Sequence, residues 1–106
     1  MLEVDKMTFE TEVLQTKGLV FVDFWSPSCV PCIALLPELE AFAEKNEGKA
    51  KFCKLNSGAN KRLAISQKIL GLPTLAFYKD GEKVAVFGKD EIKMNAIQAK
   101  LDELLP

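Results

Sequence analysis

Two cysteines in the segment W-S-P-S-C-V-P-C-I, residues 25–33, are the residues of this sequence best suited to chemistry. Cys29 and Cys32 are three positions apart and follow an apolar run. Such a pair can supply part of a metal site, can be inert and buried, or can form and break a disulfide. The surrounding residues distinguish these three interpretations.

A metal site is the weakest interpretation. Structural zinc and iron–sulfur sites usually need four ligands, often from two Cys-x-x-Cys pairs. The chain has 3 cysteines and no histidine, so a complete site would require two chains or an external ligand. The third cysteine, Cys53, lies in a predicted strand, where a free cysteine packs as a small apolar side chain. We therefore expect no bound metal, and a metal-carrying dimer is the last alternative.

The predicted position of the pair favours redox chemistry. Cys29 falls in the first turn of a predicted helix over 29–46, and Pro31 suits that turn because its missing N–H is not needed there. The unpaired amide groups and the macrodipole favour negative charge at this end, so the Cys29 thiol should ionise more readily than a free cysteine. Residues three apart share a helix face, which lets the sulfurs meet. We expect Cys29 to attack a substrate disulfide and Cys32 to resolve the mixed disulfide.

Proton transfer in a chain without histidine must use carboxylates, lysines or thiols. Asp23 lies in L-V-F-V-D-F-W, residues 19–25, which predicts a strand buried on both faces. A carboxyl group between Val22 and Phe24 is poorly solvated, which should raise its pKa and suit it to acid–base catalysis. Lys54, on the next predicted strand, is a candidate partner. The residues alone equally allow an Asp23 that faces water, and they favour an ordinary solvated Lys54.

The remaining pattern predicts an α/β fold. A strand–helix–strand unit, ending with a strand over 50–55, predicts parallel strands joined by a right-handed crossover. Asp80-Gly81 between two apolar runs predicts a hairpin. The other expected features are a short helix capped by Thr8, a kink at Pro37, a helix over 61–69 with Leu63, Ala64 and Leu70 inward, and a last helix over 90–105.

Composition fits one compact domain over residues 1–106. Hydrophobic residues make up 48%, and the net charge of −1 with scattered basic residues argues against a nucleic-acid or anionic-membrane surface. The first residues show no secretory signal pattern, and no apolar run approaches the ~18 residues of a membrane helix. We expect a soluble, cytoplasmic monomer with no nucleic-acid or membrane partner.

Several segments together resemble the thioredoxin family over essentially the whole chain. They are F-V-D-F-W, C-V-P-C with the following Pro37, K-L-N, G-L-P-T, Y-K-D-G-E and F-G. The resemblance implies a central mixed β-sheet flanked by helices on both faces. It implies a thiol–disulfide oxidoreductase that reduces protein disulfides through a reversible Cys29–Cys32 disulfide, with no bound cofactor. Electrons would come from NADPH through a thioredoxin reductase, which would be its partner along with disulfide-containing proteins.

The resemblance also implies roles for single residues. It matches Cys29 to the nucleophile and Cys32 to the resolving thiol. Asp23 matches the buried acid, Lys54 the lysine near it, and Pro73 a cis-proline beside the disulfide. The residues expected to contact substrate are Trp25, Ser28, Val30, Leu72, Pro73 and Gly88.

Pro73 has a physical interpretation as well. At the head of a strand it would leave the Leu72 backbone free to pair with an extended substrate segment. An ordinary trans proline that begins a strand is the simpler interpretation from the residues alone.

Three positions depart from the family pattern. Ser28 and Val30 stand where the family usually has Trp and Gly, and Ile33 replaces a common lysine. Ser28 removes a large aromatic side chain and has a hydroxyl able to cap the helix or reach the Cys29 thiolate. Val30 and Ile33 make the surface around the cysteine pair more apolar. These changes affect which reductase and which targets fit.

Other functions remain as alternatives. A disulfide oxidase or isomerase would differ in reduction potential rather than in fold. A glutaredoxin would carry a Gly-Gly signature after the proline-headed strand, and the sequence has none. A redox-inactive docking module would use the same apolar patch but would not need two thiols. A dithiol reductase is therefore the favoured prediction.

Overall fold

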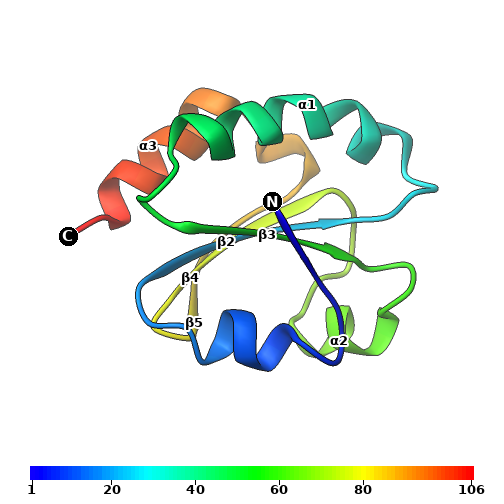
Figure 1. Cartoon of the computed structure of the whole chain (residues 1–106). Coiled ribbons are helices and arrows are strands. Elements are labelled where there is room, and N and C mark those ends of the chain that lie inside the picture. Colours follow the sequence, from blue (N-terminus) through cyan, green and yellow to red (C-terminus); the bar gives the residue numbers. More distant parts are fainter.

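The structure is a computed structural model that describes residues 1–106, and a mixed β-sheet forms its middle layer (Figure 1). The strand order is β1-β3-β2-β4-β5. β3 is parallel to both β1 and β2, whereas β2–β4 and β4–β5 are antiparallel. The strands are β1 (Leu2–Val4), β2 (Leu19–Trp25), β3 (Lys51–Asn56), β4 (Thr74–Lys79) and β5 (Glu82–Phe87). The parallel crossover unit and the hairpin around Asp80-Gly81 are both as predicted.

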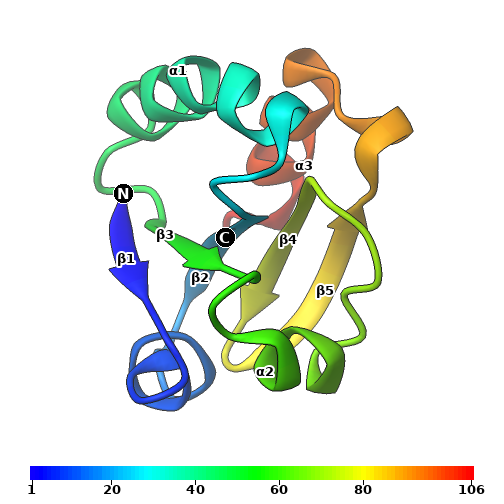
Figure 2. The same cartoon turned by 90° about the vertical axis from the view of Figure 1, so that its right-hand side faces the viewer.

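Helices cover both faces of the sheet (Figures 1 and 2). One face carries α1 (Val30–Lys45) and α3 (Met94–Leu104), and the other carries η1 (Glu10–Leu14) and α2 (Lys61–Ser66). A short 3₁₀ turn, η2 (Lys89–Glu91), precedes α3. No helix has the length and apolar character needed to cross a bilayer.

The central strand β2 is buried on both faces, as its nearly continuous apolar sequence predicts. Alternate side chains enter two separate cores. The core under α1 and α3 contains Leu19, Phe21, Leu39, Phe42, Leu75, Phe77, Ile97 and Leu101. The core under η1 and α2 includes Val20, Val22, Phe24, Phe9, Val13, Cys53, Leu55 and Tyr78. These two cores hold β2 rigidly below the start of α1.

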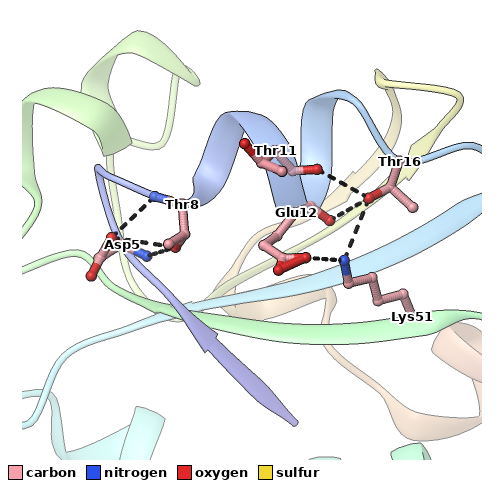
Figure 3. Close-up of polar contacts among 6 residues, drawn as sticks. All are labelled: Asp5, Thr8, Thr11, Glu12, Thr16 and Lys51. Atoms are coloured by element: carbon pink, nitrogen blue, oxygen red, sulfur yellow. Dashed lines mark hydrogen bonds and ion pairs between the residues drawn. The ribbon is translucent and has the colours of Figure 1, made fainter.

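The N-terminal segment differs from the prediction in two ways. It contains a short strand, β1, and the cap of the following helical turn is Asp5 rather than Thr8. The Asp5 carboxylate accepts the N–H groups of Met7 at 2.8 Å and Thr8 at 3.1 Å, while Thr8 Oγ1 accepts the N–H of Asp5 at 3.0 Å (Figure 3). Asp5 is three residues earlier in the chain, and its carboxylate satisfies the first amide groups of the turn that leads into η1, whereas η1 itself has no side-chain cap.

The turn η1 is also tied to the sheet by side chains (Figure 3). Lys51 on β3 donates to Glu12 at 2.7 Å and to the Thr16 hydroxyl at 3.4 Å. Both partners of this ion pair are partly exposed, so we assign it little net stability.

Two helix boundaries also differ from the prediction. The last helix begins at Met94, and Asp90 belongs to the turn η2. The helix α2 ends at Ser66, and Lys68 takes a left-handed conformation with φ 63°. Because helical periodicity stops there, Leu70 is 89% exposed and Ile69 is buried instead. Pro37 lies inside α1, and the kink expected there stays a prediction.

Candidate active site

The chain leaves β2 through a short loop and enters α1 (Figure 2). Cys29 and Cys32 form a disulfide at the start of this helix. Their Cα atoms are 5.2 Å apart. Cys29 is half-buried, whereas Cys32 is only 1% exposed. The two sulfurs therefore differ in access, with Cys29 as the sulfur that a substrate can approach.

The Cys29 sulfur itself caps the helix. Cys29 is the N-cap residue, and its Sγ accepts the N–H of Cys32 at 3.3 Å. Pro31 occupies the first turn, as predicted. A helix start whose N–H groups point at a sulfur favours negative charge on that sulfur.

The turn before Cys29 is held by two serines. The N–H of Cys29 donates to the Ser26 carbonyl at 3.1 Å. The Ser26 and Ser28 hydroxyls are 3.0 Å apart, and Ser26 Oγ also accepts the Ser28 N–H at 3.3 Å. Of the two roles considered for the Ser28 hydroxyl, capping the helix is wrong, because the hydroxyl contacts Ser26 and the Cys29 sulfur takes the capping position. Contact with the Cys29 thiolate stays a prediction.

Asp23 lies in the interior of the sheet, 1% exposed, and not at a solvated strand end. Burial raises its pKa to about 7; Lys54 opposes this shift and Glu40 on α1 adds to it. Its Oδ2 atom has no hydrogen-bond partner. A carboxyl group with this pKa can both hold and release a proton near neutrality.

Lys54 stands opposite Asp23 in the parallel register of β2 and β3. The two residues nevertheless form no ion pair. The Lys54 ammonium lies over the ring of Trp25, 5.6 Å from the ring centroid. Lys54 is half-buried, so it is not the ordinary solvated lysine that the residues alone favoured.

The end of the sheet beside the disulfide gathers the other predicted contact residues. β4 begins there, and the Leu72–Pro73 peptide bond just before it is cis, as the resemblance implies. Phe87 pairs with Leu75, which brings Gly88 to the same end of the sheet. Val30 is 78% exposed and, with Ile33, forms an apolar surface beside Cys29.

A groove of about 260 Å³ begins at Ser26 and runs along α2 to Leu72. Its other lining residues include Ser57, Ile65 and Leu70, which the sequence analysis did not assign to the site. Ile65 and Leu70 are both exposed, and the Ser57 hydroxyl is buried without a hydrogen-bond partner. The signal that could have found Leu70 is an apolar residue just beyond the end of a short helix; no local signal points to Ser57 or Ile65.

Two other features lie outside this site. A larger hollow of about 610 Å³ lies between the later turns of α1 and α3, from Glu38 onward. Neither hollow is lined by a cysteine, but the smaller groove begins at Ser26, in the turn just before Cys29. Cys53 is a fully buried free thiol, as predicted, and burial raises its pKa to about 11. The structure has no cluster of three or more metal-binding side chains.

Known proteins with this arrangement were found by sequence and by structure. The profile of the thioredoxin family matches residues 1–103. A thioredoxin of Peptoclostridium acidaminophilum is 50% identical over 101 residues, covering 95% of this chain and 92% of the relative. One of Acetoanaerobium sticklandii is 44% identical over 105 residues, covering 99% and 100%. The solved structure of a mutant thioredoxin from Halobacterium salinarum superposes with a TM-score of 0.86 at 28% identity, covering 99% of this chain and 90% of that one.

Proposed function

This chain belongs to the thioredoxin family and is a thiol–disulfide oxidoreductase that reduces protein disulfides, and we propose that Cys29 is its nucleophile and Cys32 its resolving thiol. The observation that carries these roles is the difference in access between two bonded sulfurs. Cys29 is half-buried at a helix start, and Cys32 is 1% exposed. Disulfide exchange requires a thiolate that the substrate sulfur can approach.

The reaction balances as two successive exchanges. The Cys29 thiolate attacks one sulfur of the substrate disulfide, whose S–S bond breaks, and the other substrate sulfur leaves as a thiolate that takes a proton from water. Cys32 then loses its proton and attacks the Cys29 sulfur, which releases the second substrate thiolate. The substrate gains two electrons, and the pair loses two and ends as the Cys29–Cys32 disulfide.

Asp23 is proposed to take the proton that Cys32 loses. A raised pKa of about 7 leaves a substantial fraction of the carboxyl ionised at neutrality, so that it can act as a base. It also lets the protonated form return the proton when a reductase reopens the disulfide. Lys54, opposite Asp23 in the register, is proposed as the charge that assists this exchange.

Substrate is proposed to dock across the apolar surface around the disulfide. The Leu72 backbone before Pro73 would pair with an extended segment that carries the target cysteine. The proposed contact residues are Trp25, Ser28, Val30, Leu72, Pro73 and Gly88, with the groove along α2 as an extension. Val30 and Ile33 add apolar contact area, and small Ser28 leaves space, so these positions are proposed to select the partners.

The electron source is proposed to be NADPH through a thioredoxin reductase, with no cofactor bound to this chain. We also propose that residues 1–106 act as a monomeric domain in the cytoplasm, where thiols are kept reduced.

The test of the proposed function is turnover of a disulfide-bonded protein with NADPH and a reductase, combined with redox titration of the Cys29–Cys32 couple against glutathione. Turnover at a reducing potential is expected; an oxidising potential would identify an oxidase or isomerase, and no turnover with any reductase would indicate a docking module.

We expect the variant Leu70→Ser to raise the KM for protein disulfides in this assay without changing kcat for a small disulfide. Leu70 is 89% exposed, so its apolar area is free to contact substrate. If contact with substrate buries part of this side chain, the loss of ~1 kcal/mol corresponds to a rise in KM of about fivefold. The matched control is Val84→Ser, an exposed apolar residue on the half of β5 remote from the disulfide. Equal KM values for the two variants would contradict a docking role for the groove.

A further inference from the structure

Lys54 lies between two partners on one face of the sheet. Its register partner on β2 is Asp23, and Trp25 is two residues further along the same strand. Alternate residues of a strand face the same side, so Asp23 and Trp25 both lie on the face that α1 covers. The ammonium group of Lys54 can therefore approach either the carboxyl of Asp23 or the face of the Trp25 ring.

The structure, in which the disulfide is formed, shows which partner Lys54 takes. Its Nζ lies 5.6 Å from the centroid of the Trp25 ring. It forms no ion pair with Asp23, and Asp23 Oδ2 has no hydrogen-bond partner. The Lys54 ammonium is thus against the indole ring, while Asp23 Oδ2 stays buried without a partner.

We propose that Trp25 is a positioning residue whose indole face holds the Lys54 ammonium away from the Asp23 carboxyl group while that group carries its proton. When the proton leaves, the ammonium moves from the indole ring to the carboxylate. The proposal deepens the proposed acid–base role of Asp23. In the reaction above, Asp23 takes the proton as Cys32 closes the disulfide, and the structure has this disulfide closed. The proton taken up comes from the Cys32 thiol, and Lys54 only changes its position.

The physical basis is a change in which partner attracts the ammonium more strongly. A neutral carboxyl offers little to a cation, whereas an aromatic face attracts one. An ionised carboxylate in a partly buried site attracts the ammonium more strongly than a ring does. Burial raises the pKa of Asp23 even though Lys54 lowers it.

Other charges face this pair and are the same in both positions of Lys54. Glu40 on α1 raises the pKa of Asp23. Glu3 on β1 is the other register partner of Lys54 and is exposed. On β4 the residue opposite Asp23 is Leu75, which carries no charge. The two cysteines of α1 are bonded and do not titrate in the oxidised protein.

The first test needs no variant. Protons on the Lys54 side chain above an indole ring have upfield-shifted NMR resonances, because of the ring current. In the oxidised wild-type protein we expect this upfield shift at low pH, and we expect it to shrink with the same midpoint as the ¹³C titration of the Asp23 carboxyl. Lys54 resonances that stay constant through the Asp23 titration would overturn the proposal.

The second test distinguishes an effect of the Trp25 ring on Lys54 from an effect of water that enters beside Asp23, both of which would change the pKa of Asp23. In Trp25→Leu, Lys54 is released, and the pKa of Asp23 should fall by roughly 0.5 to 1 unit, with a smaller fall in Trp25→Phe, whose ring still attracts a cation. In a Lys54→Met background the same Trp25 substitutions should leave the pKa of Asp23 unchanged. An equal fall in that background would mean that water entry lowers the pKa, and would overturn the proposal. Because no turnover is measured, a negative result leaves the roles of Cys29 and Cys32 intact.

Discussion

Cys29→Ser is expected to abolish the reduction of protein disulfides. The substitution leaves the size of the side chain nearly unchanged but replaces a sulfur nucleophile with a hydroxyl, which cannot form a disulfide with the substrate. Loss of the nucleophile should lower turnover by at least about a thousandfold, as removal of a catalytic nucleophile commonly does. The measurement is NADPH consumption in the reductase-coupled assay.

The companion variant Cys32→Ser distinguishes the two sulfurs. It keeps the exposed nucleophile and removes the buried thiol, so the first exchange proceeds and the second does not. A mixed disulfide between Cys29 and the substrate should then accumulate, visible as a reducible adduct on a non-reducing gel and by mass spectrometry. The adduct should be absent with Cys29→Ser. An adduct on Cys32 in Cys29→Ser would reverse the proposed roles, and full reduction by Cys29→Ser would contradict a reaction that needs both thiols.

Cys53→Ala is the matched control for both variants. Cys53 is fully buried in the core on the other face of the sheet, and burial raises its pKa to about 11. A thiol with these properties is neither accessible nor ionised at neutral pH. We expect this variant to keep wild-type turnover, at some cost in stability from the small cavity that the substitution leaves.

The parts of the fold that could be predicted are those in which local sequence and tertiary structure agree. The run over 19–25 is apolar on both faces because β2 is covered on both faces, and Asp80-Gly81 forms the hairpin turn with positive φ at both residues. β1 was not predicted because a strand of three residues gives too short a pattern. Leu70 was placed inward because helical periodicity does not reveal the left-handed residue Lys68 that ends it.

Some features of the candidate site could likewise be predicted from the sequence, and others could not. The cysteine pair at a helix start follows from local features, since two cysteines lie three apart just after an apolar strand. The residues alone left a buried and a water-facing Asp23 equally open, and the structure shows that it is buried. The position of Lys54 does not follow from local features, because it depends on a competition between Asp23 and Trp25 across two strands. The groove along α2 also depends on a chain reversal after Ser66 rather than on any local motif.

The burial that prepares Asp23 for acid–base chemistry should also make the protein less stable as pH rises. The pKa of Asp23 is about 7 in the folded protein, against the ordinary value of 3.8 that represents the unfolded chain. The folded state therefore holds the proton more tightly, and the contribution of Asp23 to stability is complete below the unfolded pKa and lost as pH rises through the folded one. The size of the shift corresponds to ~4 kcal/mol, as an order of magnitude.

Asp23→Asn removes this titration while keeping the shape of the side chain. The variant should therefore gain stability over the wild type as pH rises from about 4 through about 7, by up to ~4 kcal/mol, because the wild type must ionise a buried carboxyl group and the variant need not. The measurement is urea unfolding of both proteins at several pH values, with the disulfide intact so that no thiol of the pair titrates. Asp90→Asn, which changes an exposed carboxylate on η2, is the control and should show no such trend.

The same variant is expected to be a poorer enzyme. Without a carboxylate to take the Cys32 proton, resolution of the mixed disulfide at neutral pH should slow by roughly a hundredfold, the lower end of general-base effects, with little change in KM. A more stable protein with slower exchange would show that the unfavourable burial of Asp23 is retained for the reaction. An unchanged pH–rate profile would remove Asp23 from the mechanism, and a stability difference that does not vary with pH would mean that its pKa is not raised by burial.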